Sequence, residues 1–152
     1  MILPADFKDA KTITEVALKS KAYWGYTNEQ LESWIDDLTI TSECITKNSS
    51  YVYKVNENIV GFYIIEMLNM TTISLEFLFV LPEFIGKGIG HQLISHAIEK
   101  ARNLKGFVLN TLSDPNAESF YAKYGFKTIS HHESSIPDRF LPEMELEFPE
   151  NM

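Results

Sequence analysis

The chain has 152 residues, a length that fits one domain with a sizeable hydrophobic core. Its formal net charge is −8, which argues against a general nucleic-acid-binding protein because such proteins present a basic face. The longest apolar run, Ile59 to Ile65, is far shorter than a membrane span. We therefore expect a globular protein that binds neither nucleic acid nor a membrane.

Cysteine and histidine usage narrows the class further. Cys44 is the only cysteine, so an intrachain disulfide is excluded and a reducing compartment is the simple interpretation. The first ten residues lack the basic and apolar segments of a secretory signal, and we expect a cytoplasmic protein. His131, His132 and Glu133 are adjacent, but neighbours on a strand point to opposite faces, so no metal site is predicted.

In the first half of the chain, apolar spacing predicts two helices and a hairpin. A short first strand precedes a helix over Asp9–Ala22. Residues Thr27–Gln30, TNEQ, predict a capping box that starts a second helix, whose apolar stripe runs from Leu31 to Leu38. The segments SYVYKV and IVGFYII flank the turn NEN and predict a β-hairpin.

In the second half, the strand TTISLEFLFV leads into a glycine-rich segment and then a helix. On this helix we expect His96 to face solvent, and we expect Gly106 to end it in a left-handed conformation. A short strand, FVLNTL, precedes a short helix with Gly125 just past its end, and two paired strands follow. The order predicts an α+β fold: a mostly antiparallel sheet with a central βαβ unit and helices on both faces, in a single domain over residues 1–152.

The segment Phe84–Gly90, FIGKGIG, holds three of the seven glycines of the chain. A strand that runs through such a turn into a helix presents backbone N–H groups at the positive end of the helix dipole. Glycine lets an anion approach the backbone and permits positive φ. The segment therefore predicts a phosphate site, and a tight turn with glycine for packing is the alternative.

Common nucleotide-binding motifs do not account for this loop. The P-loop pattern ends in Gly-Lys-Ser/Thr, whereas here Gly90 is followed by His91. The dinucleotide fingerprint G-x-G-x-x-G is not met either, because Gly86, Gly88 and Gly90 are spaced by two. Neither nucleotide interpretation is favoured.

Two segments resemble the GNAT (Gcn5-related N-acetyltransferase) superfamily, and the expected order of elements follows its fold over essentially the whole chain. VLPEFIGKGIGHQLISHAIEKAR is similar to the acetyl-CoA-binding motif V-x-P-x-x-[QR]-[GR]-x-G-[IL]-[GA], and NAESFYAKYGF is similar to N-A-x-x-F-Y-x-K-x-G-F. SSIPDRFLPEM resembles a bacterial subgroup with S-I-P-G-R-x-L-P and a mostly unassigned substrate. Ile85 departs from the first motif, where Gln or Arg is usual, which affects a side-chain contact and not the backbone contacts.

The resemblance implies acetyl-CoA as the acetyl-donor cosubstrate, with no metal. Backbone N–H groups of the loop would hold the pyrophosphate, and the preceding strand would lie along the pantetheine arm. Asn116 matches an asparagine that bonds this arm, although helix capping is its alternative role. The implied cosubstrate-binding residues are Leu78, Phe79, Val80, Ile85, Gly86, Lys87, Gly88, Ile89, Gly90, His91 and Asn116.

Tyr121 and Glu76 are the catalytic residues that the resemblance implies. Tyr121 matches the general acid for the CoA thiolate, with Tyr124 in reserve; packing is the alternative, because several aromatic residues share this helical face. Glu76 interrupts an apolar strand and matches a glutamate that removes the amine proton in many relatives. The alternative for Glu76 is a carboxylate in solvent.

The acceptor is expected to be a primary amine of a small molecule or peptide. Tyr23, Trp24 and Tyr26 could hold a cationic or aromatic amine, and Arg139 could anchor an acceptor carboxylate. A homodimer is common in the family. The alternatives to an N-acetyltransferase are an acyl-CoA-binding sensor, or pseudo-enzyme, without turnover and a nucleotide-binding module.

Overall fold

The computed structural model describes all 152 residues. The strands are β1 (Ile2–Pro4), β2 (Ser49–Val55), β3 (Asn58–Met67), β4 (Thr72–Val80), β5 (Val108–Leu112), β6 (Lys127–Glu133) and β7 (Phe140–Glu147). The helices are α1 (Ala10–Ala22), α2 (Asn28–Ser33), α3 (Ile35–Leu38), α4 (Ser42–Lys47), α5 (Ile89–Asn103) and α6 (Glu118–Ala122). Short 3-10 turns are η1 (Phe7–Asp9), η2 (Pro82–Phe84), η3 (Pro115–Ala117) and η4 (Pro149–Asn151).

The strands form one seven-stranded sheet in the order β1-β2-β3-β4-β5-β7-β6. Strand β4 pairs with β5 in parallel through Thr72–Ser74, as expected for a βαβ unit, and β5 pairs with β7 antiparallel. The chain divides into two compact units, which we describe separately: unit 1 is Met1–Ile65 with Phe77–Ala97, and unit 2 is Glu66–Glu76 with Ile98–Met152. The predicted α+β fold class is confirmed.

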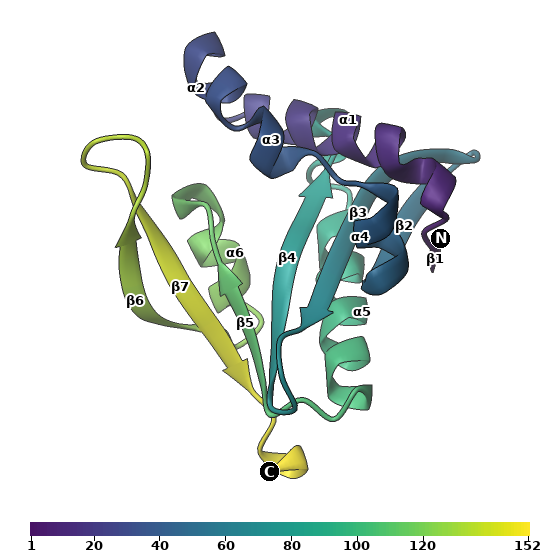
Figure 1. The fold of residues 1–152 in the computed structure, drawn as a ribbon, viewed down its shortest axis with the longest axis vertical. Coiled ribbons are helices and arrows are strands. Elements are labelled where there is room, and N and C mark those ends of the chain that lie inside the picture. Colours follow the sequence, from purple (N-terminus) through teal and green to yellow (C-terminus); the bar gives the residue numbers. More distant parts are fainter. The chain divides into compact units, whose positions relative to one another are not determined.

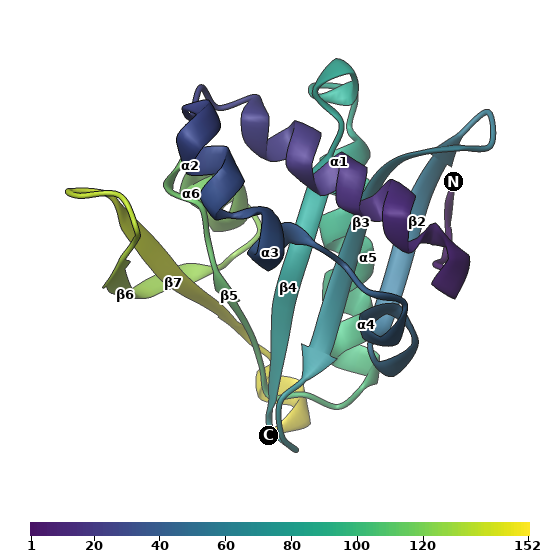
Figure 2. The ribbon, with the colours of Figure 1, turned by 45° about the horizontal axis from the view of Figure 1, so that its top comes forward.

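In unit 1, helices cover both faces of the sheet (Figures 1 and 2). Side chains of α1, α3 and α4 pack on one face, in a core formed by Ile13, Val16, Ala17, Leu38, Ile40, Ile45, Val52, Phe62 and Ile64. Helix α5 packs on the other face, where a β-carbon on Gly61 would lie 3.1 Å from Leu93 Cδ1. Glycine at this position therefore lets α5 approach β3 closely.

His96 does not face solvent, so that prediction was wrong. Its Nδ1 lies 2.6 Å from the hydroxyl of Tyr63, and its ring centroid lies 4.7 Å from that of Tyr51. Tyr63 is fully buried, and a buried tyrosine hydroxyl requires a hydrogen-bond partner. Burial, with a smaller contribution from Tyr51, raises the pKa of Tyr63 far above its ordinary value, so the phenol stays neutral.

The predicted second helix is shorter than its apolar stripe suggested. Its capping box is confirmed, with Gln30 N–H donating to Thr27 Oγ1 and Thr27 N–H donating to Gln30 Oε1. The helix ends at Ser33, and Trp34 separates it from α3 with φ −103° and ψ 0°. Leu38 is the only buried residue of the two helices, so the apolar stripe had too little to pack against to continue as one helix. Helix α4 was not predicted.

The two helix ends predicted at Gly106 and Gly125 differ. Gly125 has φ +94° and ends α6 as expected. At the end of α5 the left-handed residue is instead Lys105, with φ +66°, and Gly106 N–H bonds back to Ala101 O. Gly106 also lies close to Ile73: a β-carbon there would be 2.6 Å from Ile73 Cδ1, so the Ile73 side chain would have to shift.

In unit 2, strands β5, β7 and β6 form an antiparallel ladder. Met144 of the middle strand, β7, lies opposite Thr111 of β5 on one side and opposite Thr128 of β6 on the other. Leu109, Thr111 and Met144 are buried. Tyr121 of α6 is also buried, and the centroid of its ring lies 5.4 Å from that of the Phe126 ring. These contacts fix α6 on unit 2, where Asn116 and Tyr121 lie.

Candidate active site

The glycine loop, Ile85–His91, joins η2 to α5. Gly86 and Gly88 have φ of +83° and +82°, and a β-carbon at either would meet nothing within 4 Å. Backbone conformation, and not packing, therefore requires glycine at these two positions. The first helical hydrogen bond runs from Gln92 N–H to Gly88 O, so the preceding N–H groups lie ahead of the internal bonds of α5.

The side chains of the loop contribute little charge near its backbone N–H groups. Ile85 is 45% exposed, and its N–H donates to Pro82 O at 3.2 Å. The amide of Ile85 therefore belongs to η2, and the amides offered by the loop begin at Gly86. The ammonium of Lys87 lies 5.2 Å from the centroid of the Phe84 ring, and the Lys87 side chain is exposed.

The end of β4, Leu78–Val80, lies beyond the residues that pair with β5. Leu81 N–H donates to Val60 O at 2.7 Å, so the preceding carbonyl, that of Val80, points to the edge away from β3. The hydroxyl of Ser20 donates to this carbonyl. Sequence reasoning missed Ser20, although a buried polar residue on the apolar stripe of α1 was a usable signal.

The aromatic residues after α1 separate into two pairs. Tyr23 and Trp24 are 53% and 47% exposed, and their rings meet edge to face at 5.0 Å. Tyr26 packs edge to face on Trp34 at 4.8 Å, and the ammonium of Lys21 lies 5.5 Å from the Tyr26 ring. A cation of the protein itself therefore already contacts Tyr26.

Tyr121 lies in a closed environment within unit 2. It is 6% exposed, and its hydroxyl is hydrogen-bonded to Thr111, whose own hydroxyl donates to Leu75 O at 3.1 Å. Burial raises the pKa of Tyr121 above its ordinary value, the hydrogen bond with Thr111 opposes this, and the charge of Asp114 adds to it. The phenol is therefore protonated at neutral pH.

Glu76, the second expected catalytic residue, is exposed on β4.

Among the described residues, no group of three His, Cys, Asp or Glu side chains could hold a metal ion. His132 contacts Glu143 at 2.8 Å, and this hydrogen bond, with a second from Asn110, lowers the pKa of Glu143. None of the helices combines the length and the hydrophobicity that a membrane span needs.

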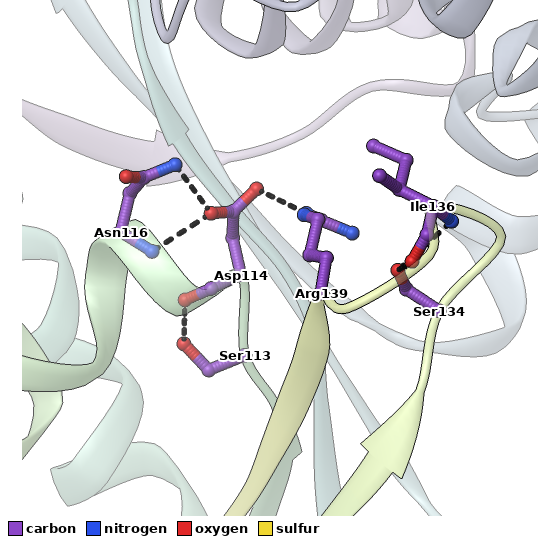
Figure 3. Close-up of polar contacts among 6 residues, drawn as sticks. All are labelled: Ser113, Asp114, Asn116, Ser134, Ile136 and Arg139. Carbon is purple, nitrogen blue, oxygen red and sulfur yellow. Dashed lines mark hydrogen bonds and ion pairs between the residues drawn. The ribbon is translucent and has the colours of Figure 1, made fainter.

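Asp114, Asn116 and Arg139 form a set of side chains that we call the clasp (Figure 3). Arg139 Nη2 donates to Asp114 Oδ2 at 2.9 Å. Asp114 Oδ1 accepts from the backbone N–H and the Nδ2 of Asn116, each at 2.9 Å. The Arg139 and Asp114 side chains are only 13% and 14% exposed. The Asp114 carboxylate therefore already binds the Arg139 guanidinium, which we expected to anchor an acceptor carboxylate.

Each unit thus brings together part of the expected site. Unit 1 holds the glycine loop, the end of β4 and the exposed pair Tyr23 and Trp24. Unit 2 holds Glu76, Tyr121 and the clasp. Sequence reasoning missed the contacts made by Ser20, Thr111 and Asp114. Ser20 and Asp114 each had a signal, Ser20 as a polar residue on the apolar stripe of α1 and Asp114 as a helix cap before a proline, whereas Thr111 had none.

Comparison with solved structures identifies the fold. The chain resembles the PaiA N-acetyltransferase of Thermoplasma acidophilum in complex with coenzyme A, with 22% identity and a TM-score of 0.79 over 97% of this chain and 98% of that chain. It resembles a GNAT family acetyltransferase of Elizabethkingia anophelis with acetyl-CoA bound, with 19% identity, a TM-score of 0.71 and coverage of 97% of both chains. An aminoglycoside 6′-N-acetyltransferase complexed with coenzyme A matches with 14% identity, a TM-score of 0.73 and coverage of 97% and 96%.

The family follows from a direct match of the sequence. The family model described as Acetyltransferase (GNAT) domain matches residues 46–128, more than half of the chain. The protein therefore belongs to the GNAT acetyltransferase family. No curated protein matches the sequence.

Proposed function

We propose that this protein transfers the acetyl group of acetyl-CoA to a primary amine of a small molecule or a peptide. The observation that carries the proposal is the glycine loop inside the family match: two residues in left-handed conformation precede the N-terminus of α5, and the N–H groups there lie ahead of the internal hydrogen bonds of the helix. A pyrophosphate is the group that such an arrangement favours. A single cysteine agrees with a reducing cytoplasm as the place of action.

The donor would bind through backbone groups. The N–H groups from Gly86 to Gly90, with His91 beside them, would hold the pyrophosphate, and Leu78–Val80 would lie along the pantetheine arm. A strand N–H facing the thioester oxygen would stabilise the oxyanion, a contribution of about 3–4 kcal/mol in other enzymes.

Proton transfer would involve Tyr121 and Glu76. A phenol is a weaker acid than a thiol, so Tyr121 would donate a hydrogen bond to the developing thiolate and complete the transfer where burial makes the sulfur more basic. Glu76, which is exposed, would take the proton of the acceptor ammonium directly or through water.

The acceptor would contact the exposed pair Tyr23 and Trp24. Their accessible rings suit a cationic or aromatic amine, whereas Tyr26 already contacts Lys21. Tyr26 would therefore support the exposed pair and would not contact the acceptor itself.

Two measurements test the proposal. Calorimetric titration with acetyl-CoA, CoA, NAD and ATP should give binding for the first two alone, and binding of NAD or ATP alone would replace the proposal with a nucleotide-binding module. A panel of small amines and peptides, with release of the CoA thiol as the readout, should give turnover for at least one class.

One observation favours a second candidate, a sensor that binds acyl-CoA without turnover. The hydroxyl of Tyr121 is buried and bonded to Thr111, as a packing residue would be. Tight binding of acetyl-CoA together with no thiol release across the whole panel would favour the sensor.

A further inference from the structure

Ser20 is the one polar residue on the buried face of α1. The other buried residues of this helix, Ile13, Val16 and Ala17, are apolar. The Ser20 hydroxyl donates to the carbonyl of Val80, the last residue of β4, and both residues lie in unit 1. Figures 1 and 2 show α1 crossing the sheet where β4 ends. A hydroxyl therefore lies at the point where α1 meets the end of this strand.

The peptide group between Val80 and Leu81 is held at both ends. Its N–H donates to Val60 O of β3, and its carbonyl accepts from Ser20. The N–H and the carbonyl of one strand residue point to the same edge, so the Val80 N–H also faces away from β3. Of the strand N–H groups that a thioester oxygen could meet on this edge, that of Val80 is therefore next to Ser20.

The oxygen of the Ser20 hydroxyl can still accept a hydrogen bond. A hydroxyl has one O–H donor and two lone pairs, and the donor is used on Val80. This bond is the only one that the Ser20 hydroxyl makes within the chain. Ser20 is 7% exposed, so only a small donor, such as an N–H of an amine, can approach its oxygen.

The exposed aromatic pair lies on the same face of α1 as Ser20. Tyr23 and Trp24 are three and four residues further on, a spacing that makes side chains neighbours on a helix. The helical turn continues through both residues, since Tyr23 N–H donates to Ser20 O and Trp24 N–H donates to Lys21 O. Ser20 therefore contacts the strand proposed for the thioester and neighbours the rings proposed for the acceptor.

We propose that Ser20 Oγ accepts one N–H of the acceptor amine and that this contact makes the site selective for primary amines. The inference rests on the proposed acetyl transfer. In that reaction the nitrogen lone pair forms the C–N bond to the thioester carbonyl carbon, and the C–S bond breaks with its electron pair on sulfur. One N–H proton leaves the nitrogen to a base, and the CoA thiolate takes up a proton. The other N–H of a primary amine stays in the amide product, and this is the one that Ser20 holds.

A secondary amine cannot keep the same contact. Its neutral form has a single N–H, and that proton must leave when the tertiary amide forms. A hydrogen bond from this N–H to Ser20 would be lost as the reaction proceeds, so it would not stabilise the transition state. Loss of the Ser20 hydroxyl should therefore affect primary amines and spare secondary ones.

Steady-state kinetics with phenethylamine and N-methylphenethylamine test the proposal. Ser20→Ala should lower kcat/KM for the primary amine about tenfold, as expected for one hydrogen bond, and leave kcat/KM for the N-methyl analogue within about twofold. Other primary amines that the thiol-release panel identifies are paired with their N-methyl analogues in the same way. An equal fall for both amines, or no fall for the primary amine, would overturn the proposal.

Ser50→Ala is the matched control. Ser50 is also 7% exposed in unit 1, and its hydroxyl also donates to a backbone carbonyl, that of Ile45, at 3.2 Å. Ser50 lies on β2, which β3 separates from β4. Its loss should leave the ratio of kcat/KM for the two amines unchanged. A change as large as that in Ser20→Ala would overturn the proposal, because the effect would then not depend on the end of β4.

Binding of acetyl-CoA separates this role from a purely structural one. If Ser20 only held α1 on the end of β4, Ser20→Ala would weaken acetyl-CoA binding together with turnover, whereas we expect the calorimetric affinity to stay within about twofold. Ser20→Cys offers only a weak acceptor and should show the same loss of preference; it serves if Ser20→Ala fails to fold in a thermal unfolding scan. Absence of thiol release with every amine in the wild-type protein would instead overturn the proposed function, and the role of Ser20 with it.

Discussion

The glycine loop and the clasp are both polar regions of the molecule, yet they are built differently. The loop uses backbone N–H groups and two glycines with positive φ, all within a few residues of one another. The clasp uses side chains that lie 25 residues apart, Asp114 and Arg139, and it depends on a largely buried ion pair. A site made of backbone tolerates changed side chains but not a changed backbone, whereas the clasp depends on each of its three side chains.

The largest expected effect is on the backbone of the loop. Gly88→Glu should abolish acetyl-CoA binding, because φ of +82° is strained for any other residue and the new carboxylate would repel the pyrophosphate. Calorimetric titration gives the measurement. Gly25→Glu is the control, because Gly25 also has φ of +82° and open space for a side chain; it should bind acetyl-CoA normally. Unchanged affinity in Gly88→Glu would exclude the loop as the pyrophosphate site.

Next in size is the loss of the Tyr121 hydroxyl, a side-chain group in the same unit as the clasp. Tyr121→Phe keeps the packing and should lower kcat about 100-fold or more, with acetyl-CoA affinity nearly intact. Tyr124→Phe is the control and should stay close to wild type. A kcat of Tyr121→Phe within about threefold of wild type would show that Tyr121 has a packing role only.

The pH dependence of the same reaction gives an independent check on Tyr121. The proton donor is active below its pKa, and burial raises that pKa above the ordinary value near 10. The active form should therefore persist as pH rises, and kcat should show no loss from Tyr121 between neutral pH and about pH 10. A loss of activity in this range that disappears in Tyr121→Phe would contradict the raised pKa.

A smaller effect is expected where the loop departs from the family motif. Ile85→Arg should tighten acetyl-CoA binding less than about tenfold, because a cation at this exposed position adds only a solvent-screened ion pair. Lys87→Ala should likewise cost little. A gain near a hundredfold in Ile85→Arg would show that side chains, and not the backbone, limit this loop, and the sensor would then be favoured over the enzyme.

The smallest effect concerns backbone conformation outside both regions. Lys105→Gly should stabilise the protein by about 1 kcal/mol, because Lys105 has φ of +66° at the end of α5. Gly125→Ala should act in the opposite direction, since Gly125 has φ of +94° and its new β-carbon would lie 3.3 Å from Leu146 Cδ1. Urea unfolding of the two variants measures both changes.

Much of the fold could be predicted because its signals are local. Apolar spacing predicted α1, the β2–β3 hairpin and the βαβ unit. The capping box predicted at Thr27 is also present in the structure. The glycine loop was equally visible, since φ at Gly86 and Gly88 is a property of the turn itself. The break at Trp34 was not visible, because it depends on what the apolar stripe finds to pack against.

The sequence by itself determined the family, the sheet with its βαβ unit and the glycine loop, because each depends on residues within a few positions of one another. Only the tertiary structure decided the partners of side chains that are distant in the chain. It paired Arg139 with Asp114, Ser20 with the Val80 carbonyl and His96 with Tyr63. Folding brings these groups together, and each buried polar atom then bonds whichever partner lies within about 3 Å, which no spacing along the chain specifies.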